Sequence, residues 1–157
     1  YFPSLKNLIS EKQEDGITTI SLLSGDFLMP YLLSSVDGGR GMMNTINAIP
    51  IDYLTWGNHE NDLPHADLME REKEFLGTWL NTNMQSHESF LDSTCQKDYD
   101  TIEIQNGDHA RKIALLGILS NAPSLYSPGA FNGATIEDPW ATIEEYVDQL
   151  ENEVDCL

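Results

Sequence analysis

Apolar positions at the start of the chain change from a helical to a strand-like spacing. Three of them recur at i, i+3 and i+4 and predict an amphipathic helix that ends near Gln13. They are Leu5, Leu8 and Ile9. The next run, from Ile17 to Leu23, is apolar or β-branched almost throughout, which is typical of a strand buried on both faces. We therefore expect a helix and then a core strand that ends at Ser24-Gly25-Asp26.

A helix followed by a strand is predicted again farther along the chain. Apolar side chains at helical spacing between Met42 and Ile49 predict a helix that Pro50 closes. The short apolar run from Ile51 to Trp56 predicts a second strand, followed by Gly57-Asn58-His59-Glu60. Because a strand, a helix and a strand in succession usually form neighbouring parallel strands, we expect both strand ends to open on one edge of a sheet.

A polar segment with one apolar stripe predicts the next helix, from about Pro64 to Leu76, with Asp62 near its N-cap. The charged run from Glu70 to Glu74 is expected to face water. The side chains expected to point inward are Leu68, Phe75 and Leu76.

The second half of the chain predicts a short strand, a hairpin and a closing helix. Residues 79–84 predict a strand, and residues 85–97 a polar surface segment. Apolar runs on both sides of Asn106-Gly107-Asp108 predict a β-hairpin. A loop over residues 120–136 is expected to lead into a helix capped by Asp138-Pro139, with Trp140, Ile143, Val147 and Leu150 on one face. The whole pattern predicts the α/β class, with a mixed β-sheet sandwich flanked by helices.

The net charge of the chain limits the classes of partner that we expect. Its 157 residues include 26 acidic and 8 basic side chains, which give a formal net charge of −18. This balance argues against a nucleic-acid backbone or an anionic membrane surface as partner, and divalent cations or cationic surfaces are better matches. A solvated acidic face is expected to account for most of the charge. No apolar run reaches the roughly 20 residues that a membrane-spanning helix needs. Cys95 and Cys156 have no zinc-binding spacing, and the sequence leaves open whether they pair.

The candidate chemistry lies at the two strand ends. A carboxylate at the tip of a buried strand, Asp26, needs a partner, and Gly25 beside it lets a ligand approach closely. Asn58 adds an amide oxygen, His59 an imidazole and Glu60 a second carboxylate. Hard divalent ions accept such a set, and two ions can clamp a phosphoryl group while activating a water. Taken alone, Asp26 is better explained as an N-cap or turn carboxylate. Together with Asn58 and His59 at a second strand end, it favours a metal site.

These residues resemble two motifs of the calcineurin-like metallophosphoesterases, Ser24-Gly25-Asp26 the second motif and Gly57-Asn58-His59-Glu60 the third. Similarity to the 5′-nucleotidase and UDP-sugar hydrolase branch of that family covers nearly the whole chain. It comprises Gly41-x-x-Asn44, Ile51 to Leu54, Asp62, Leu80-x-Thr82-Asn83, Lys112 to Gly117 and Asp138-Pro139-Trp140. The resemblance implies a four-layer α/β/β/α catalytic domain, of which residues 1–157 are expected to be the central part.

The resemblance also implies a role for each matching residue. Asp26 is expected to bridge two divalent metal ions, and Asn58 to bind the second ion and the phosphate. His59 is expected to lie near the scissile phosphate, where it stabilises charge or protonates the leaving group, oriented by Glu60 or Asp26. The implied reaction is attack of a metal-activated water on a phosphate ester, with a nucleotide as the substrate. The resemblance leaves the metal open among manganese, zinc, cobalt, iron and magnesium.

Two parts of the family pattern are missing from this chain. No D-x-H motif precedes Asp26, and neither the later histidine nor the G-H-x-H motif is present. Because the number and geometry of ligands set metal affinity, we expect the parent protein to be a hydrolase and this chain by itself to be inactive. A smaller departure is Asn61, where this branch more often has an aromatic residue.

The sequence is compatible with three functions. The first is metal-dependent hydrolysis of phosphate esters such as nucleotides. The second is a related chemistry, either cleavage of the pyrophosphate of nucleotide sugars or hydrolysis of a thiosulfate ester. The third is a degenerate, non-catalytic binding module on the same fold. Asn121, Tyr126 and Asn132 lie in the predicted loop and could approach a substrate, although such a loop needs no function.

Overall fold

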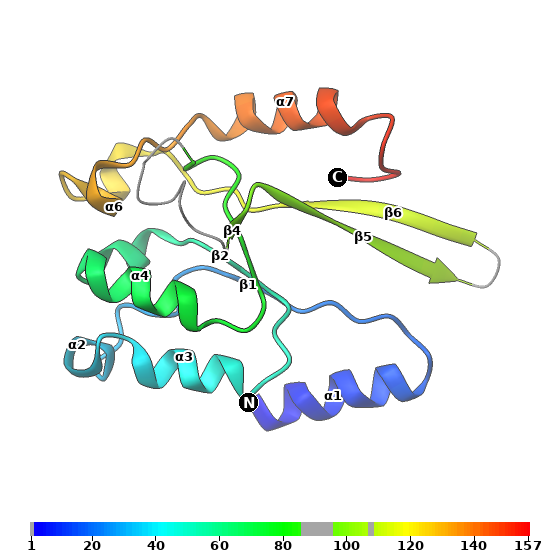
Figure 1. Cartoon of the computed structure of the whole chain (residues 1–157), viewed down its shortest axis with the longest axis horizontal. Helices are drawn as coiled ribbons and strands as arrows, with labels where there is room; N and C mark the ends of the chain where they lie inside the picture. Colours follow the sequence, from blue (N-terminus) through cyan, green and yellow to red (C-terminus); the bar gives the residue numbers. More distant parts are fainter. Residues whose placement is uncertain (1, 86–95, 107–108) are drawn as a thin grey trace.

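The strands of the protein form two sheets in the computed structural model, which describes residues 2–85, 96–106 and 109–157 (Figure 1). Within these residues, a parallel sheet has the strand order β1-β2-β3-β4. Its strands are β1 (Leu22–Ser24), β2 (Tyr53–Thr55), β3 (Thr78–Leu80) and β4 (Gln96–Lys97). The second sheet is an antiparallel hairpin of β5 (Tyr99–Asn106) and β6 (His109–Leu116). Strands of both kinds together with helices confirm the predicted α/β class.

Helices lie on opposite sides of these strands in the view of Figure 1. Helix α7 (Pro139–Leu150) runs along the top of the view near the hairpin, whereas α1 (Phe2–Glu14) and α3 (Arg40–Asn47) lie at the bottom. Further helical segments are α2 (Ser34–Asp37), the 3₁₀ helix η1 (Asn58–Asp62), α4 (His65–Glu74), the 3₁₀ helix η2 (Pro123–Leu125) and α6 (Ala130–Gly133). No helix in the described ranges is long and apolar enough to cross a membrane.

The ends of the first and last helices follow their sequence signals. Helix α1 ends at Glu14, and Gly16 then adopts a left-handed φ of 73°. Helix α7 begins where the sequence predicts, because the Asp138 carboxylate accepts hydrogen bonds from the N–H groups of Trp140 at 3.0 Å and Ala141 at 2.9 Å. These bonds satisfy donors that the first turn of a helix leaves without a partner.

Strands β1 and β2 are the neighbouring parallel strands that the sequence predicts. Their register pairs Leu22 with Tyr53 and Ser24 with Thr55. Because both strands run in the same direction, the residues that follow them leave the sheet at the same edge. The two polar motifs therefore begin side by side.

The first strand is shorter and more exposed than its sequence predicts. Only Leu22–Ser24 forms a strand, and the predicted burial on both faces is wrong, because Ile17 is 50% and Leu22 51% exposed. Side chains alternate between the two faces of a strand. Leu23 packs against the core on one face, whereas its two neighbours point to the other face, which is open.

Two charged residues of α4 are buried, so the predicted solvated face is wrong at these positions. Arg71 and Glu72 are each 1% exposed. The Arg71 guanidinium donates to the Gly38 carbonyl at 3.1 Å and pairs with Glu74 at 2.6 Å, so its charge is compensated. Leu76, expected to point inward, is 83% exposed, because α4 ends at Glu74 and the chain has left the helix.

The hairpin is connected to the parallel sheet at the end of β3. Strands β5 and β6 pair from Tyr99 opposite Leu116 to Asn106 opposite His109, which confirms the predicted hairpin. Beyond β3, the Thr82 N–H donates to the Gly117 carbonyl at 2.9 Å, and the Gly117 N–H donates to Thr82 Oγ1 at 2.8 Å. These reciprocal bonds hold the two sheets together at the edge where the strands β1 to β3 end.

Several predicted features lie outside the described residues, namely Gly107-Asp108 of the turn, Cys95 and most of the polar segment around it. Among the residues that the structure describes, Cys156 is a free and exposed thiol. The predicted loop over residues 120–136 contains the short helices η2 and α6.

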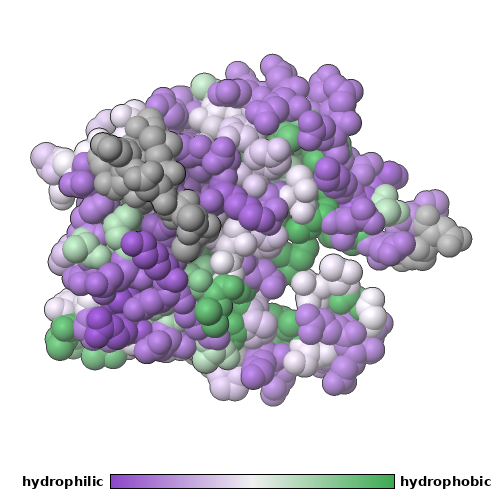
Figure 2. Space-filling model, in the orientation of Figure 1, coloured by the Kyte–Doolittle hydropathy of each residue, from purple (hydrophilic) through white to green (hydrophobic). Residues whose placement is uncertain are grey.

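Aromatic rings form the centre of the core. The rings of Trp56 and Trp79 are stacked, with centroids 4.3 Å apart and an interplanar angle of 22°. The ring centroid of Phe27 lies 5.7 Å from that of Trp79, and the ring centroid of Phe131 lies 6.0 Å from that of Trp56. Since Phe27 follows the first polar motif directly and Trp56 precedes the second, core packing anchors both motifs. The outer surface is mostly hydrophilic in the view of Figure 2.

Candidate active site

The segments that follow β1 and β2 approach each other so closely that only glycine fits at the contact. A Cβ atom on Gly25 would lie 2.4 Å from both Cα and N of Gly57. A Cβ atom on Gly57 would lie 2.3 Å from Oδ1 of Asp26. Gly25 also has a left-handed φ of +73°. The two motif glycines therefore allow the two strand ends to touch.

Asp26 holds its carboxylate against the turn that follows β2. Its backbone φ is 56°, which is uncommon for a residue other than glycine. Its Oδ1 atom accepts a hydrogen bond from the N–H of His59 at 3.0 Å. The residue is exposed, so the carboxylate is open to a ligand. The structure thus brings Asp26 and His59 together from neighbouring strand ends.

Glu60 joins the two segments through a buried carboxylate that is 0% exposed. It accepts four backbone N–H groups, from Asp26 at 2.7 Å, Phe27 at 2.9 Å, Leu28 at 3.0 Å and Gly57 at 2.7 Å. Burial raises the pKa of Glu60, and the four donors act against this rise. Both carboxylate oxygens are thus occupied by backbone groups, and within the described residues the expected orienting contact from Glu60 to the His59 ring is absent.

The carboxylate that orients the His59 ring is Asp62. Its Oδ2 lies 2.7 Å from Nδ1 of His59. Both residues belong to η1, and side chains three residues apart are eclipsed in a 3₁₀ helix. This hydrogen bond is the main cause that raises the pKa of His59. Partial desolvation of the ring lowers this pKa, and the negative charge of Asp26 raises it further.

The contact of Asp62 with His59 is the feature of the candidate site that the sequence did not predict. Asp62 was assigned near the N-cap of α4, but Pro64 occupies that position and no side chain caps the helix. The spacing of three residues from His59 is the signal that could have found it, provided that the turn after Gly57 is recognised as a 3₁₀ helix.

Asp26, Asn58 and His59 are the candidate donors for a divalent ion at these two strand ends. Asn58 opens η1, is half-buried, and its side-chain amide makes no hydrogen bond within the described part of the chain. A carboxylate, an amide oxygen and an imidazole are donors that such ions accept. However, no group of three or more His, Cys, Asp and Glu side chains among residues 2–85, 96–106 and 109–157 is placed to hold a metal. These residues fit a divalent ion as a partial coordination sphere that needs further donors.

Tyr126 brings the segment after β6 towards Asp26. The pKa of Tyr126 is raised to about 12, first by burial and then by the negative charge of Asp26. Its hydroxyl donates to the carbonyl of Ser120. The phenol therefore stays neutral and is held by its own loop.

Asn61 fixes the same loop to η1. Its Oδ1 atom accepts a hydrogen bond from the N–H of Phe131 at 2.7 Å. Phe131 and Asn132 have left-handed φ values of 48° and 58°, so this bond supports an unusual backbone. The 5′-nucleotidase branch that this chain resembles more often has an aromatic residue at this position. Here Asn61 has a structural role. Asn121 and Asn132 are exposed residues of this loop.

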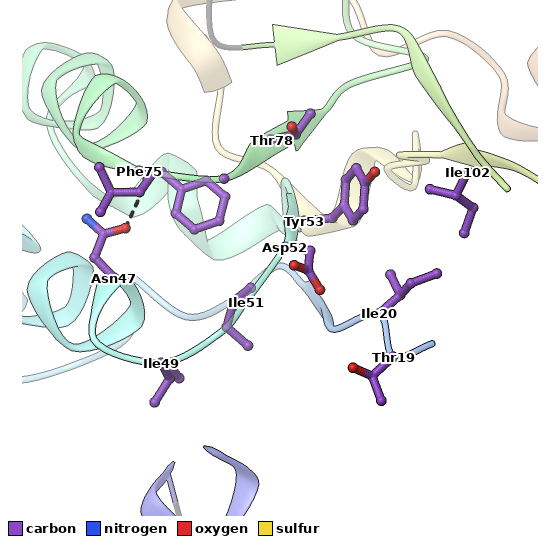
Figure 3. A pocket seen from close by; sticks show the side chains of 12 residues that line it. Thr19, Ile20, Asn47, Ile49, Ile51, Asp52, Tyr53, Phe75, Thr78 and Ile102 are labelled. Atoms are coloured by element: carbon purple, nitrogen blue, oxygen red, sulfur yellow. Dashed lines mark hydrogen bonds between the residues drawn. The ribbon is translucent and has the colours of Figure 1, made fainter. Parts of the chain in front are cut away.

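A cavity of about 430 Å³ lies at the opposite edge of the parallel sheet (Figure 3). It is lined by residues that lead into the strands, among them Ile20, Ile51, Asp52 and Thr78. The Asp52 carboxylate already accepts the Ser21 N–H at 2.8 Å. The cavity is therefore separate from Asp26 and His59, which follow the strands.

Comparisons with known proteins point to one fold. No protein-family model and no curated protein matches the sequence. The NAD nucleotidase of Haemophilus influenzae matches with a TM-score of 0.78 at 23% identity, over 97% of this chain and 26% of that chain. The sulfate thiohydrolase SoxB of Thermus thermophilus matches with a TM-score of 0.75 at 18% identity, over 96% of this chain and 27% of that chain. The calcineurin-like phosphoesterase YfkN of Bacillus subtilis matches with a TM-score of 0.66 at 16% identity, over 96% of this chain and 50% of that chain.

The chain therefore spans between 26% and 50% of the length of these three structures. Each match covers 96% or 97% of this chain. The protein has the fold of the calcineurin-like phosphoesterases, over part of the domain.

Proposed function

We propose that the chain provides one side of the active site of a metal-dependent phosphate-ester hydrolase whose substrates are nucleotides. The observation that carries the proposal is the contact of Asp26 with the His59 backbone, made by two strand ends that converge at one edge of the sheet. Within this proposal, residues 1–157 are the central part of one metallophosphoesterase catalytic domain.

Asp26 and Asn58 would hold the metal ions in this site. Divalent ions, when bound, polarise the phosphoryl oxygens and activate a water. The metal could be manganese, zinc, cobalt, iron or magnesium, since one carboxylate and one amide oxygen do not select among these ions.

His59 is the proton donor in this proposal. Its Nδ1 faces the Asp62 carboxylate at 2.7 Å, so the carboxylate, which only accepts, fixes a proton on Nδ1. The raised pKa of His59 favours a second proton, on Nε2. That proton can pass to the leaving-group oxygen of the ester, or remain and stabilise the charge that develops there.

Turnover needs metal donors in addition to those described. Even if the His59 imidazole is counted, one carboxylate, one amide and one imidazole cannot hold two ions tightly, because affinity depends on ligand number and geometry. We therefore expect the 157-residue chain alone to bind a divalent ion weakly and to be inactive.

The nucleotide substrate is supported by the match to an NAD nucleotidase. The match to a sulfate thiohydrolase keeps a second chemistry in view, because it has a similar TM-score on the same fold. Cleavage of nucleotide-sugar pyrophosphate and a non-catalytic binding module are further alternatives, since fold alone does not determine function.

Titration of the chain with Mn²⁺ by calorimetry tests the metal site. We expect Asp26→Asn to abolish binding and the matched variant Asp52→Asn, at the opposite edge of the sheet, to retain it. Equal binding by the wild type and Asp26→Asn would contradict the proposed site.

Hydrolysis assays test the reaction and the substrate. AMP, UDP-glucose and a thiosulfate ester are offered with Mn²⁺ to the chain and to any longer natural protein that contains it. Turnover of AMP by the longer protein, lost in His59→Ala, would support the proposal, and binding of AMP without turnover would favour the binding module. Turnover by the 157-residue chain above that of its own His59→Ala variant would contradict the need for further donors.

A further inference from the structure

One oxygen atom connects the two strand ends of the candidate site. The Oε2 atom of Glu60 accepts the N–H of Asp26 at 2.7 Å and also the N–H of Gly57 at 2.7 Å. Asp26 belongs to the segment after β1, and Gly57 to the segment after β2. A single acceptor therefore bridges these two backbones.

The other oxygen of Glu60 fixes the direction of the chain beyond Asp26. Oε1 accepts the N–H groups of Phe27 at 2.9 Å and Leu28 at 3.0 Å. Three successive N–H groups thus converge on one carboxylate, which is the arrangement of a backbone anion-binding nest. In this protein the anion is a side chain of the second motif.

This arrangement explains how Asp26 keeps its disfavoured conformation. A residue other than glycine remains at a left-handed φ, here 56°, only where its surroundings determine it from several sides. Glu60 holds the backbone N–H of Asp26, and the His59 N–H holds its Oδ1 at 3.0 Å. Both contacts come from residues 59 and 60, which are adjacent in the chain.

We propose that Glu60 is a positioning residue, which sets the Asp26 carboxylate against the Gly57–His59 turn and so fixes the spacing of the metal-binding groups. Its effect on metal binding rests on the proposed function, whereas its effect on Asp26 does not. Glu60 touches neither metal nor substrate in this role and acts through Asp26.

The test compares Glu60→Gln with a matched control, Glu72→Gln. Glu72 is another buried glutamate, 1% exposed, on α4. In Glu60→Gln the amide keeps one acceptor and places an N–H₂ group against the backbone donors. Amide hydrogen exchange and Mn²⁺ affinity are measured on the 157-residue chain.

We expect Glu60→Gln to speed exchange at Asp26, Phe27, Leu28 and Gly57 by about tenfold or more, since each loses a bond to a charged acceptor. Core amides such as Leu54 should keep their wild-type rates. Mn²⁺ affinity should fall by about tenfold or more, as for other residues that orient metal ligands. Glu72→Gln should leave the rates at the four amides and the affinity unchanged.

Faster exchange spread equally over the core, with unchanged Mn²⁺ affinity, would overturn the proposal, because it would indicate a general stabilising role. Wild-type exchange at the four amides in Glu60→Gln would also overturn it. If Glu60→Gln does not fold, Glu60→Asp serves instead: its carboxylate is one methylene shorter, so the proposal requires faster local exchange and weaker Mn²⁺ binding, and wild-type behaviour would overturn it. Failure of the wild type to bind Mn²⁺ would refute the proposed function, and the exchange pattern alone would then decide the role of Glu60.

Discussion

The Nδ1 atom of His59 lies 2.7 Å from the Oδ2 atom of Asp62, one 3₁₀ turn farther along η1. The two side chains are 42% and 43% exposed, so water screens their charges. The direct hydrogen bond is therefore the main coupling between them, and it decides which ring nitrogen is left for a substrate. Because Nδ1 is engaged by Asp62, that nitrogen is Nε2.

Replacement of Asp62 by Asn should lower the pKa of His59, since it removes the main cause of the rise. We expect NMR titration of the metal-free chain to show a His59 pKa above the ordinary value of about 6.5 in the wild type and a lower pKa in Asp62→Asn. Because the folded-state pKa is raised, the stabilising contribution of this pair is complete below about pH 6.5 and is lost as the pH rises through the folded-state pKa. The surface variant Asp148→Asn, on α7, is the control, and an equal His59 pKa in all three proteins would contradict the pairing.

Substitution of Gly25 by Ala should unfold much of the site, whereas the same change at Gly16 should be mild. Both glycines have φ of +73°, but a Cβ atom on Gly25 would lie 2.4 Å from the Gly57 backbone, and one on Gly16 would have nothing within 4 Å. Gly16→Ala therefore reports the cost of the conformation alone, about 1–2 kcal/mol. We expect Gly25→Ala to lower the free energy of unfolding by about 3 kcal/mol more, measured by urea denaturation. Equal losses in the two variants would show that the close approach is not rigid.

Sequence periodicity predicted helices and the hairpin well, because those signals are local. The cap at Asp138 and the full pairing of β5 with β6 follow from residues close in the chain. Burial was harder to predict, since it depends on what covers a residue. Arg71 belongs to a run of charges that resembles a solvated helix face, but it is buried because the Gly38 carbonyl and Glu74 lie within its reach.

The candidate site could be located from the sequence, but its internal contacts could not. Adjacent parallel strands made the meeting of Asp26 and His59 predictable. The assignment of the two remaining carboxylates required the turn geometry. Glu60 and Asp62 are two residues apart in η1 and point to different partners, one to buried backbone groups and the other to the His59 ring.

Removal of the Asn83 side chain should destabilise the edge of the fold that carries the site. Its amide donates to the carbonyls of Leu119 at 2.7 Å and Glu137 at 3.0 Å, and its Oδ1 accepts the Leu119 N–H at 2.8 Å. Asn83 is 1% exposed, so Asn83→Ala leaves buried groups without partners. We expect a loss of about 2–4 kcal/mol in the free energy of unfolding. The exposed variant Asn152→Ala should change it by less than about 0.5 kcal/mol; a similarly small change in Asn83→Ala would contradict the importance of this network.

Tyr53 should keep its proton well above the pH at which a free tyrosine loses it. Burial is the main cause that raises the pKa of Tyr53 to about 12, and the hydrogen bond from its hydroxyl to Oδ2 of Asp100, at 3.0 Å, adds to the rise. Because the folded-state pKa is above the ordinary value of about 10, the stabilising contribution is complete below about pH 10 and is lost as the pH rises towards 12. We expect NMR of ¹³C-labelled tyrosine to show Tyr53 still protonated at about pH 11 and to show a lower pKa in Asp100→Asn, where the acceptor has lost its charge. The resonance is assigned by its disappearance in Tyr53→Phe. Ionisation of Tyr53 near pH 10 in the wild type, or an equal pKa in Asp100→Asn, would contradict the coupling of β2 to β5 through this pair.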